Sequence, residues 1–190
     1  MAVHNSDIAA LFYRMAELLE IEGANPFRIR AYRRAAATVE NLPEPAARLI
    51  AKGADLTELP AIGDDLAAKI KEICATGQLQ ALKAVEARTP PALLALSALP
   101  GLGPKRIWAL YQQLGVTSVQ DLAKAASEGR VRTLPRFGAA LEAKLLKAAL
   151  ASPTPTTPRF KISTAEDFAV PLAHYLATLP DVSDVVLAGS

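Results

Sequence analysis

The stretch LPGLGPKRIWALY, residues 99–111, joins a tight turn to the start of a helix. Two glycines and two prolines form the turn, and Lys105 and Arg106 then fall in the first helical turn. The positive end of a helix dipole normally carries Asp or Glu, so two cations there are unfavourable for an isolated helix. However, the free N–H groups of a helix start bind phosphate, and glycine lets the phosphate approach closely. We therefore predict phosphate contacts at Gly101, Gly103, Lys105 and Arg106.

The same pattern occurs three times: ELPAIGDDLAAKI at 58–70, ALPGLGPKRIWAL at 98–110 and TLPRFGAALEAKL at 133–145. In each copy Leu-Pro, two variable residues and a Gly precede an apolar-periodic helix, which indicates a helix-hairpin-helix repeat. In the first copy Asp64 and Asp65 replace the basic pair, and their negative charge disfavours a phosphate beside these side chains. The candidate DNA contacts of the first copy are Ile62 and Gly63. The third copy has Arg136 in place of the first glycine, and its role is expected to be structural.

Positive charge is concentrated in the middle of the chain. Residues 1–82 carry 9 Lys or Arg and 11 Asp or Glu, residues 83–150 carry 10 and 4, and residues 151–190 carry 2 and 4. This asymmetry is typical of a face that binds a polyanion. No signal pattern or membrane span is evident, so we expect a cytoplasmic monomer without membrane contact.

Apolar periodicity predicts a mainly all-α fold of helix-hairpin-helix repeats in two small helical domains, followed by a truncated α/β start. The first domain covers residues 1–82 and the second covers residues 83–150, and the Pro- and Thr-rich segment 151–159 is a linker. Residues 160–190 read as the β-α-β beginning of a further domain. Helices are expected at 8–19, 26–41, around 49–50, and at 64–77, 91–98, 104–114, 118–128 and 138–150.

A second basic feature is NPFRIRAYRRAA, residues 25–36. Interleaved cations and aromatic residues suit single strands or frayed ends. The alternative is a solvated helix face with Tyr32 in the core, and the sequence leaves both open. The candidate contacts on this helix are Arg28, Tyr32, Arg33 and Arg34.

The repeat, the FRIRAYRRAA helix and the terminal VVLAGS together resemble the N-terminal part of the DNA polymerase X family, bacterial type, over essentially the whole chain. The resemblance implies a lyase-like domain, a fingers domain and the start of a nucleotidyltransferase palm. It also implies that two hairpins hold the DNA backbone on either side of a gap and that each binds K⁺ or Na⁺. The implied main-chain carbonyl ligands are those of Thr57, Leu59 and Ile62, and of Ser97, Leu99 and Leu102.

The resemblance also implies catalytic roles. Gly189 and Ser190 match the start of the nucleotide-binding motif that precedes the Mg²⁺-binding carboxylates of the polymerase, and the chain as given lacks those carboxylates. Lys69 stands where lyase members form a Schiff base, a reaction that needs a neutral amine. Asp65, four residues earlier, favours an ion pair with Lys69 instead. Gln78, Gln80 and Ala81 replace positions that are often cationic.

The sequence thus predicts a DNA-binding fragment of a repair polymerase that grips gapped or nicked DNA through sequence-independent backbone contacts. The parent protein would be a template-directed nucleotidyltransferase in base-excision or gap-filling repair. Two alternatives remain: a 5′-deoxyribose phosphate lyase that acts through Lys69, and a non-catalytic helix-hairpin-helix scaffold.

Overall fold

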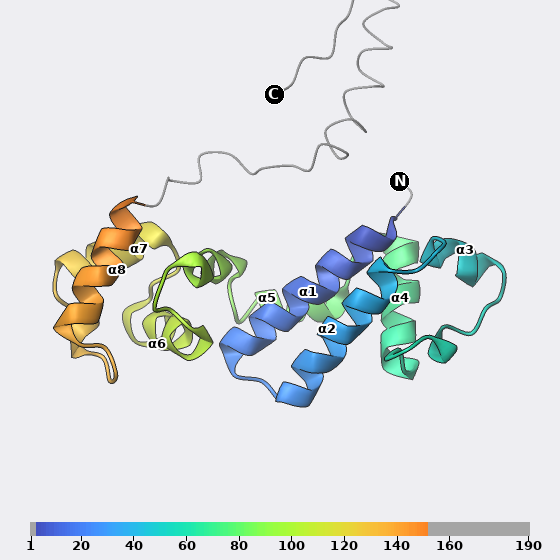
Figure 1. Ribbon diagram of the computed structural model, residues 1–190, viewed down its shortest axis with the longest axis horizontal. Coiled ribbons are helices and arrows are strands. Elements are labelled where there is room, and N and C mark those ends of the chain that lie inside the picture. Colours follow the sequence, from blue (N-terminus) through green and yellow to red (C-terminus); the bar gives the residue numbers. More distant parts are fainter. Residues whose placement is uncertain (1–2, 152–190) are drawn as a thin grey trace, which may run out of the picture. The chain divides into compact units, whose positions relative to one another are not determined.

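The computed structural model describes residues 3–151, and this part of the chain consists of helices joined by short loops, with no strand (Figure 1). The predicted all-helical architecture is confirmed here. Of the linker expected at 151–159, only Ala151 is described, and it ends the last helix; the rest of the linker and the palm start at 160–190 lie outside the described residues. The α-helices are α1 (Asn5–Glu22), α2 (Pro26–Glu40), α3 (Ala46–Ala51), α4 (Asp64–Thr76), α5 (Gln80–Glu86), α6 (Pro104–Leu114), α7 (Val119–Ser127) and α8 (Ala139–Ala151). The 3₁₀ helices are η1 (Leu56–Glu58), η2 (Pro91–Ala98) and η3 (Val131–Thr133).

Most helix starts follow from local sequence. Pro26 occupies the first position of α2, where its fixed φ suits a helix, and the Asn25 side chain accepts a hydrogen bond from the Phe27 N–H. Ser118 and Asp121 form the predicted capping box at the start of α7. The helix expected at 91–98 is present as a 3₁₀ helix of eight residues, which is long for this type. Pro90 and Pro91 stand at its start and Pro100 follows its end.

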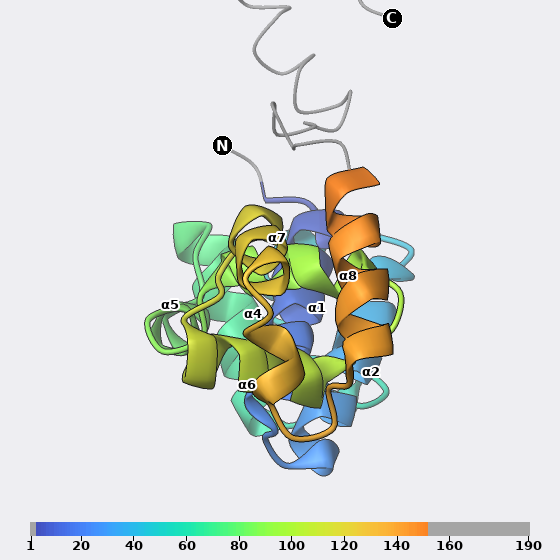
Figure 2. The ribbon, with the colours of Figure 1, turned by 90° about the vertical axis from the view of Figure 1, so that its left-hand side faces the viewer.

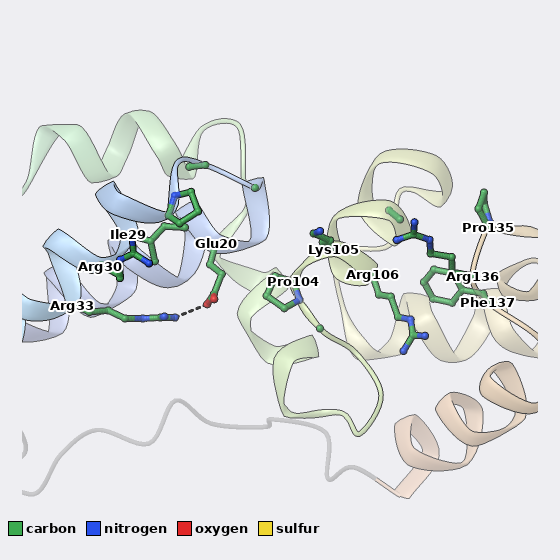
Figure 3. A pocket seen from close by; sticks show the side chains of 15 residues that line it. Glu20, Ile29, Arg30, Arg33, Pro104, Lys105, Arg106, Pro135, Arg136 and Phe137 are labelled. Atoms are coloured by element: carbon green, nitrogen blue, oxygen red, sulfur yellow. Dashed lines mark hydrogen bonds and ion pairs between the residues drawn. The ribbon is translucent and has the colours of Figure 1, made fainter.

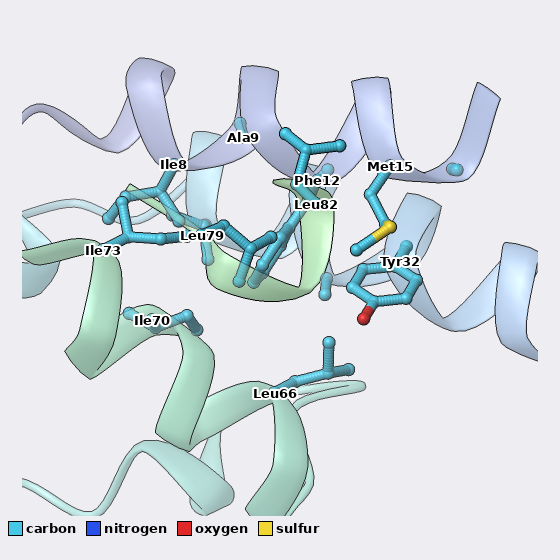
Figure 4. Close-up of a cluster of buried hydrophobic side chains, with 14 of the residues drawn as sticks. Ile8, Ala9, Phe12, Met15, Tyr32, Leu66, Ile70, Ile73, Leu79 and Leu82 are labelled. Atoms are coloured by element: carbon cyan, nitrogen blue, oxygen red, sulfur yellow. The ribbon is translucent and has the colours of Figure 1, made fainter. Parts of the chain in front are cut away.

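Two clusters of buried apolar side chains hold the described helices together. The first lies among α1, α2, α4 and α5, where Phe12 and Tyr32 meet edge to face with ring centroids 5.6 Å apart (Figure 4). The second is formed by η2, α6, α7, η3 and α8, and α7 packs beside α8 (Figures 1 and 2). Ile21, near the end of α1, is buried in the second cluster. The described residues, 3–151, accordingly belong to one compact unit.

The three hairpins share one backbone geometry. In each, a 3₁₀ turn leads into a β-turn whose second residue is proline and whose third residue has a positive φ, as in a type II turn. The positive φ angles are 61° at Ala61, 96° at Gly101 and 67° at Arg136. The turns are closed by hydrogen bonds of 3.1, 3.2 and 3.1 Å from the N–H groups of Ile62, Leu102 and Phe137 to the carbonyls of Leu59, Leu99 and Leu134. The repeat recognised in the sequence is therefore a structural repeat.

Candidate nucleic-acid interface

The second hairpin presents an open helix start. Gly103 caps α6 in an extended conformation, with φ −95° and ψ 170°, and Pro104 is the first helical residue. A Cβ built on Gly103 would meet no atom of the described chain within 4 Å, so internal packing does not demand a glycine at this exposed position. The same holds for a Cβ built on Gly63 or Gly138, the glycines at the equivalent positions of the first and third hairpins.

The two cations of this hairpin differ in their surroundings. Lys105 is exposed and forms no hydrogen bond or ion pair within residues 3–151. The Arg106 guanidinium donates a 2.8 Å hydrogen bond to the Gly101 carbonyl, and it lies 5.9 Å from the centroid of the Phe137 ring. Arg106 therefore braces the turn and connects it to the third hairpin, which the sequence did not reveal. Lys105 is the cation that is free to meet an anion.

The first hairpin has acidic residues at the start of its helix. Asp64 and Asp65 occupy the first turn of α4, where they suit the helix dipole. The expected ion pair between Lys69 and Asp65 is present, and the Lys69 side chain is only 15% exposed. A charged ammonium held by a carboxylate is a poor nucleophile. The first hairpin therefore favours a structural role over anion binding by its side chains. Of its two candidate DNA contacts, Ile62 is buried next to Gly63.

The third hairpin is fixed to α8 by a buried carboxylate. Glu142 is 1% exposed and accepts hydrogen bonds of 2.8 and 2.5 Å from the backbone N–H and the Nε of Arg132. Burial raises the pKa of Glu142, but the Arg132 hydrogen bonds and charge outweigh it and hold that pKa below its usual value. Arg136, at the left-handed position of the turn, is exposed.

Helix α2 resolves the choice that the sequence left open for Tyr32. Its ring is 2% exposed in the core, so no base can stack on it. The Arg28 guanidinium lies 6.0 Å from the centroid of that ring, and Arg33 pairs with Glu20. Arg34 is exposed on the same helix. The exposed aromatic residue is Phe27, which is 74% accessible and has the Arg30 guanidinium 4.6 Å from its ring centroid.

A groove of about 1030 Å³ separates the start of α2 from the second and third hairpins (Figure 3). We call it the cationic groove, since its lining includes five cations and a single carboxylate, that of Glu20. The charged lining residues are Glu20, Arg30, Arg33, Lys105, Arg106 and Arg136; the others are Gly23, Ala24, Pro26, Ile29, Gly103, Pro104, Ala109, Pro135 and Phe137. The fold thus brings together the second basic feature and the hairpin that sequence reasoning treated separately.

The carbonyls proposed for a monovalent cation fall at equivalent places in the first two hairpins. Thr57 and Ser97 lie in the 3₁₀ turns of the two hairpins. Leu59 and Leu99 open the β-turns, and Ile62 and Leu102 close them. The opening carbonyls, of Leu59 and Leu99, each accept the N–H that closes the turn and keep a second lone pair. Gly189 and Ser190 lie outside the described residues. Within residues 3–151, no three His, Cys, Asp or Glu residues are grouped to hold a metal ion.

Comparison with known proteins agrees with these features. Residues 3–79 match the model of a helix-hairpin-helix domain, and residues 93–149 match that of a SAM-like helix-hairpin-helix tandem. The chain is 32% identical over 188 residues to the DNA polymerase/3′-5′ exonuclease PolX of Bacillus subtilis (strain 168). The alignment covers 99% of this chain and 32% of that protein, so the chain spans about a third of the relative's length. None of the described helices has the length and apolar character needed to cross a membrane.

Proposed function

We propose that this chain, which belongs to the DNA polymerase X family, binds gapped or nicked DNA through sequence-independent contacts to the sugar-phosphate backbone. Because the chain spans about a third of its PolX relative, the activity of a whole protein is part of the same proposal. That activity is template-directed nucleotide transfer with Mg²⁺ in base-excision or gap-filling repair. The chain acts as a monomer in the cytoplasm.

The observation that carries the proposal is the second hairpin. A type II turn, an open glycine N-cap and an exposed, unpaired lysine meet at the start of an eleven-residue helix. Backbone amides and the helix dipole attract an anion there, and Lys105 adds a full charge. These groups offer no pattern that distinguishes base pairs, because contacts to phosphate position a protein without reading sequence.

Three further features support the proposal, and the first of them favours a gap or nick over intact duplex. The exposed Phe27 ring, with Arg30 beside it, is a surface on which a base of a frayed or single-stranded segment can stack. Arg28 and Arg34 supply exposed charge on the same helix. The equivalent carbonyls of the first two hairpins suit K⁺ or Na⁺, which would neutralise part of a phosphate held there.

The test is the binding of fluorescently labelled gapped and intact duplexes, followed by anisotropy at several salt concentrations. Lys105→Ala should weaken binding about 8-fold at 0.1 M salt and lower the salt slope by about 0.9, irrespective of base sequence. The matched control is Lys147→Ala, which removes an exposed lysine of α8 outside the cationic groove. A loss for one base sequence alone would refute the backbone mode, and equal affinity for gapped and intact DNA would favour a general scaffold.

The lyase alternative is disfavoured by the ion pair of Lys69 with Asp65. It predicts that borohydride traps the chain on DNA with an abasic 5′ end through Lys69. Equal trapping of the original chain and Lys69→Ala would eliminate the alternative. Trapping that depends on Lys69 and increases in Asp65→Asn would establish it.

A further inference from the structure

The third hairpin repeats the backbone of the second hairpin but not its charges. Ala140 and Leu141 stand at the positions that Lys105 and Arg106 occupy in the second copy. The first turn of α8 therefore carries no cation, whereas the first turn of α6 carries two. The third copy keeps the shape of the repeat without its basic pair, and its contacts with the second hairpin indicate what that shape is used for.

One contact joins α8 to the turn of the second hairpin. A Cβ built on Gly101 would lie 3.1 Å from Cδ1 of Leu141, so this leucine side chain lies directly against the turn. Gly101 has a φ of 96°, which glycine allows, but glycine also has more backbone freedom to lose than any other residue. The leucine that replaces the second cation of the repeat thus faces the second hairpin and restricts its turn.

Arg106 makes another contact between the two hairpins. Its guanidinium donates a 2.8 Å hydrogen bond to the Gly101 carbonyl and lies 5.9 Å from the centroid of the Phe137 ring. A planar guanidinium can donate in its own plane while its face rests on an aromatic ring. The Arg106 backbone N–H also donates within the hairpin, to the Gly103 carbonyl at 2.9 Å. Backbone and side chain of Arg106 therefore both hold the second hairpin.

The third hairpin is a firm base for these contacts. Phe137 is buried, and its N–H closes the third turn at 3.1 Å from the Leu134 carbonyl. Glu142 of α8 accepts hydrogen bonds of 2.8 and 2.5 Å from the backbone N–H and the Nε of Arg132 in η3. Because hydrogen bonds to an ionised group are stronger than neutral ones, η3, the third turn and the start of α8 are held together.

The order of the second hairpin matters for phosphate binding. Amides at a helix start bind an anion best when their directions are fixed beforehand, because ordering them on binding costs affinity. The glycine turn before α6 lets a phosphate approach closely, but it also adds backbone freedom. Contacts from outside the second hairpin offset that freedom.

We propose that the third hairpin holds the second hairpin in its DNA-binding geometry, and that Arg106 and Phe137 are positioning residues for the α6 amides. This inference rests on the proposed function, since the phosphate is received by those amides and Lys105. It assigns the Arg106 guanidinium to the turn, in place of a direct contact with phosphate.

The experiment measures binding of the full chain to a blunt duplex by anisotropy at several salt concentrations. Arg106→Gln and Arg106→Lys should both bind about 5-fold more weakly, the loss of one net hydrogen bond, because lysine keeps the charge but not the planar fork. Phe137→Leu should bind about 3-fold more weakly through loss of the cation–π contact. All three variants should keep the original salt slope, unlike Lys105→Ala. The matched control is Leu122→Val, a buried residue of α7 in the same apolar cluster, which should lower Tm and leave binding unchanged.

A second measurement needs no DNA. The Leu102 N–H closes the second turn, and its hydrogen exchange should be faster in Arg106→Lys and Phe137→Leu than in Leu122→Val. Unchanged exchange in both variants would overturn the inference, whether or not the chain binds DNA.

The binding data can also overturn it. Full affinity of Arg106→Lys, with a salt slope lower by about 0.9 in Arg106→Gln, would show a direct phosphate contact. Unchanged affinity of Phe137→Leu, or an equal loss in Leu122→Val, would show that the third hairpin has no specific effect on binding. The proposed function fails separately, if Lys105→Ala binds the blunt duplex as well as the original chain does.

Discussion

Replacing Ala61 by glycine should stabilise this protein, although Ala→Gly changes usually do the opposite. Ala61 is exposed in the first hairpin and has a φ of 61°. The left-handed conformation costs a residue with a Cβ about 1–2 kcal/mol. Glycine removes that cost, and its greater freedom in the unfolded chain takes back about 0.5–1 kcal/mol. The expected net gain is about 0.5–1 kcal/mol.

The assay is urea denaturation followed by circular dichroism, with thermal melting as a second measurement. For a protein of this size, 1 kcal/mol corresponds to about 2–4 °C in Tm. The matched control is Ala68→Gly, at an exposed position inside α4, which should lose about 1 kcal/mol because glycine weakens a helix interior. The two changes are chemically identical and differ only in backbone conformation.

An Ala61→Gly variant that is destabilised as much as Ala68→Gly would refute the assignment of a left-handed residue to the first hairpin. The reciprocal change, Gly101→Ala, should destabilise the second hairpin. It places a Cβ in the unfavourable region at φ 96°, and that Cβ would lie 3.1 Å from Cδ1 of Leu141. Retention of the original Tm by this variant would contradict the geometry of the second turn.

Three further predictions concern the described side chains. Glu142→Gln should lower Tm at pH 7 and should make Tm decline less as the pH is lowered. The pKa of Glu142 is lowered in the fold, so its carboxylate stabilises the protein above the ordinary carboxyl pKa of 4.5 and loses that effect as the pH falls through the lowered pKa. Melting curves at pH 7 and pH 3 measure this. Ser118→Ala should cost about 1 kcal/mol in urea denaturation, since the Ser118 hydroxyl accepts the Asp121 N–H at 3.0 Å. Glu20→Gln should tighten binding to gapped DNA, as measured by anisotropy, because it frees Arg33 from its carboxylate; weaker binding would contradict Arg33 as a DNA contact.

The hairpins were predictable because their causes are local. A Leu-Pro pair, two variable residues and a capping glycine specify a turn and a helix start within a few residues, so the first, second and third copies all follow from short-range chemistry. The ion pair of Lys69 with Asp65 is also local, at a spacing of one helical turn.

Sequence reasoning was less successful where distant elements meet. Tyr32 lies between cations in the sequence and reads equally well as a stacking surface, but Phe12 of α1 packs against its ring and buries it. Arg106 reads as a mobile cation, but Gly101 and Phe137 hold it. The signal that sequence analysis could have used for Arg136 is its alignment with Gly101, which marks a cation in a strained turn.

The three hairpins, the helices they begin and the concentration of positive charge in the middle of the chain follow from local sequence, because turn chemistry, helix periodicity and composition act over short distances. Which cations remain free, and which share a groove, depends on tertiary packing. The packing of α1 against α2 and of Ile21 into the second cluster sets the start of α2 opposite the second and third hairpins. That placement depends on burial of apolar surface between elements far apart in the chain, which no local pattern specifies.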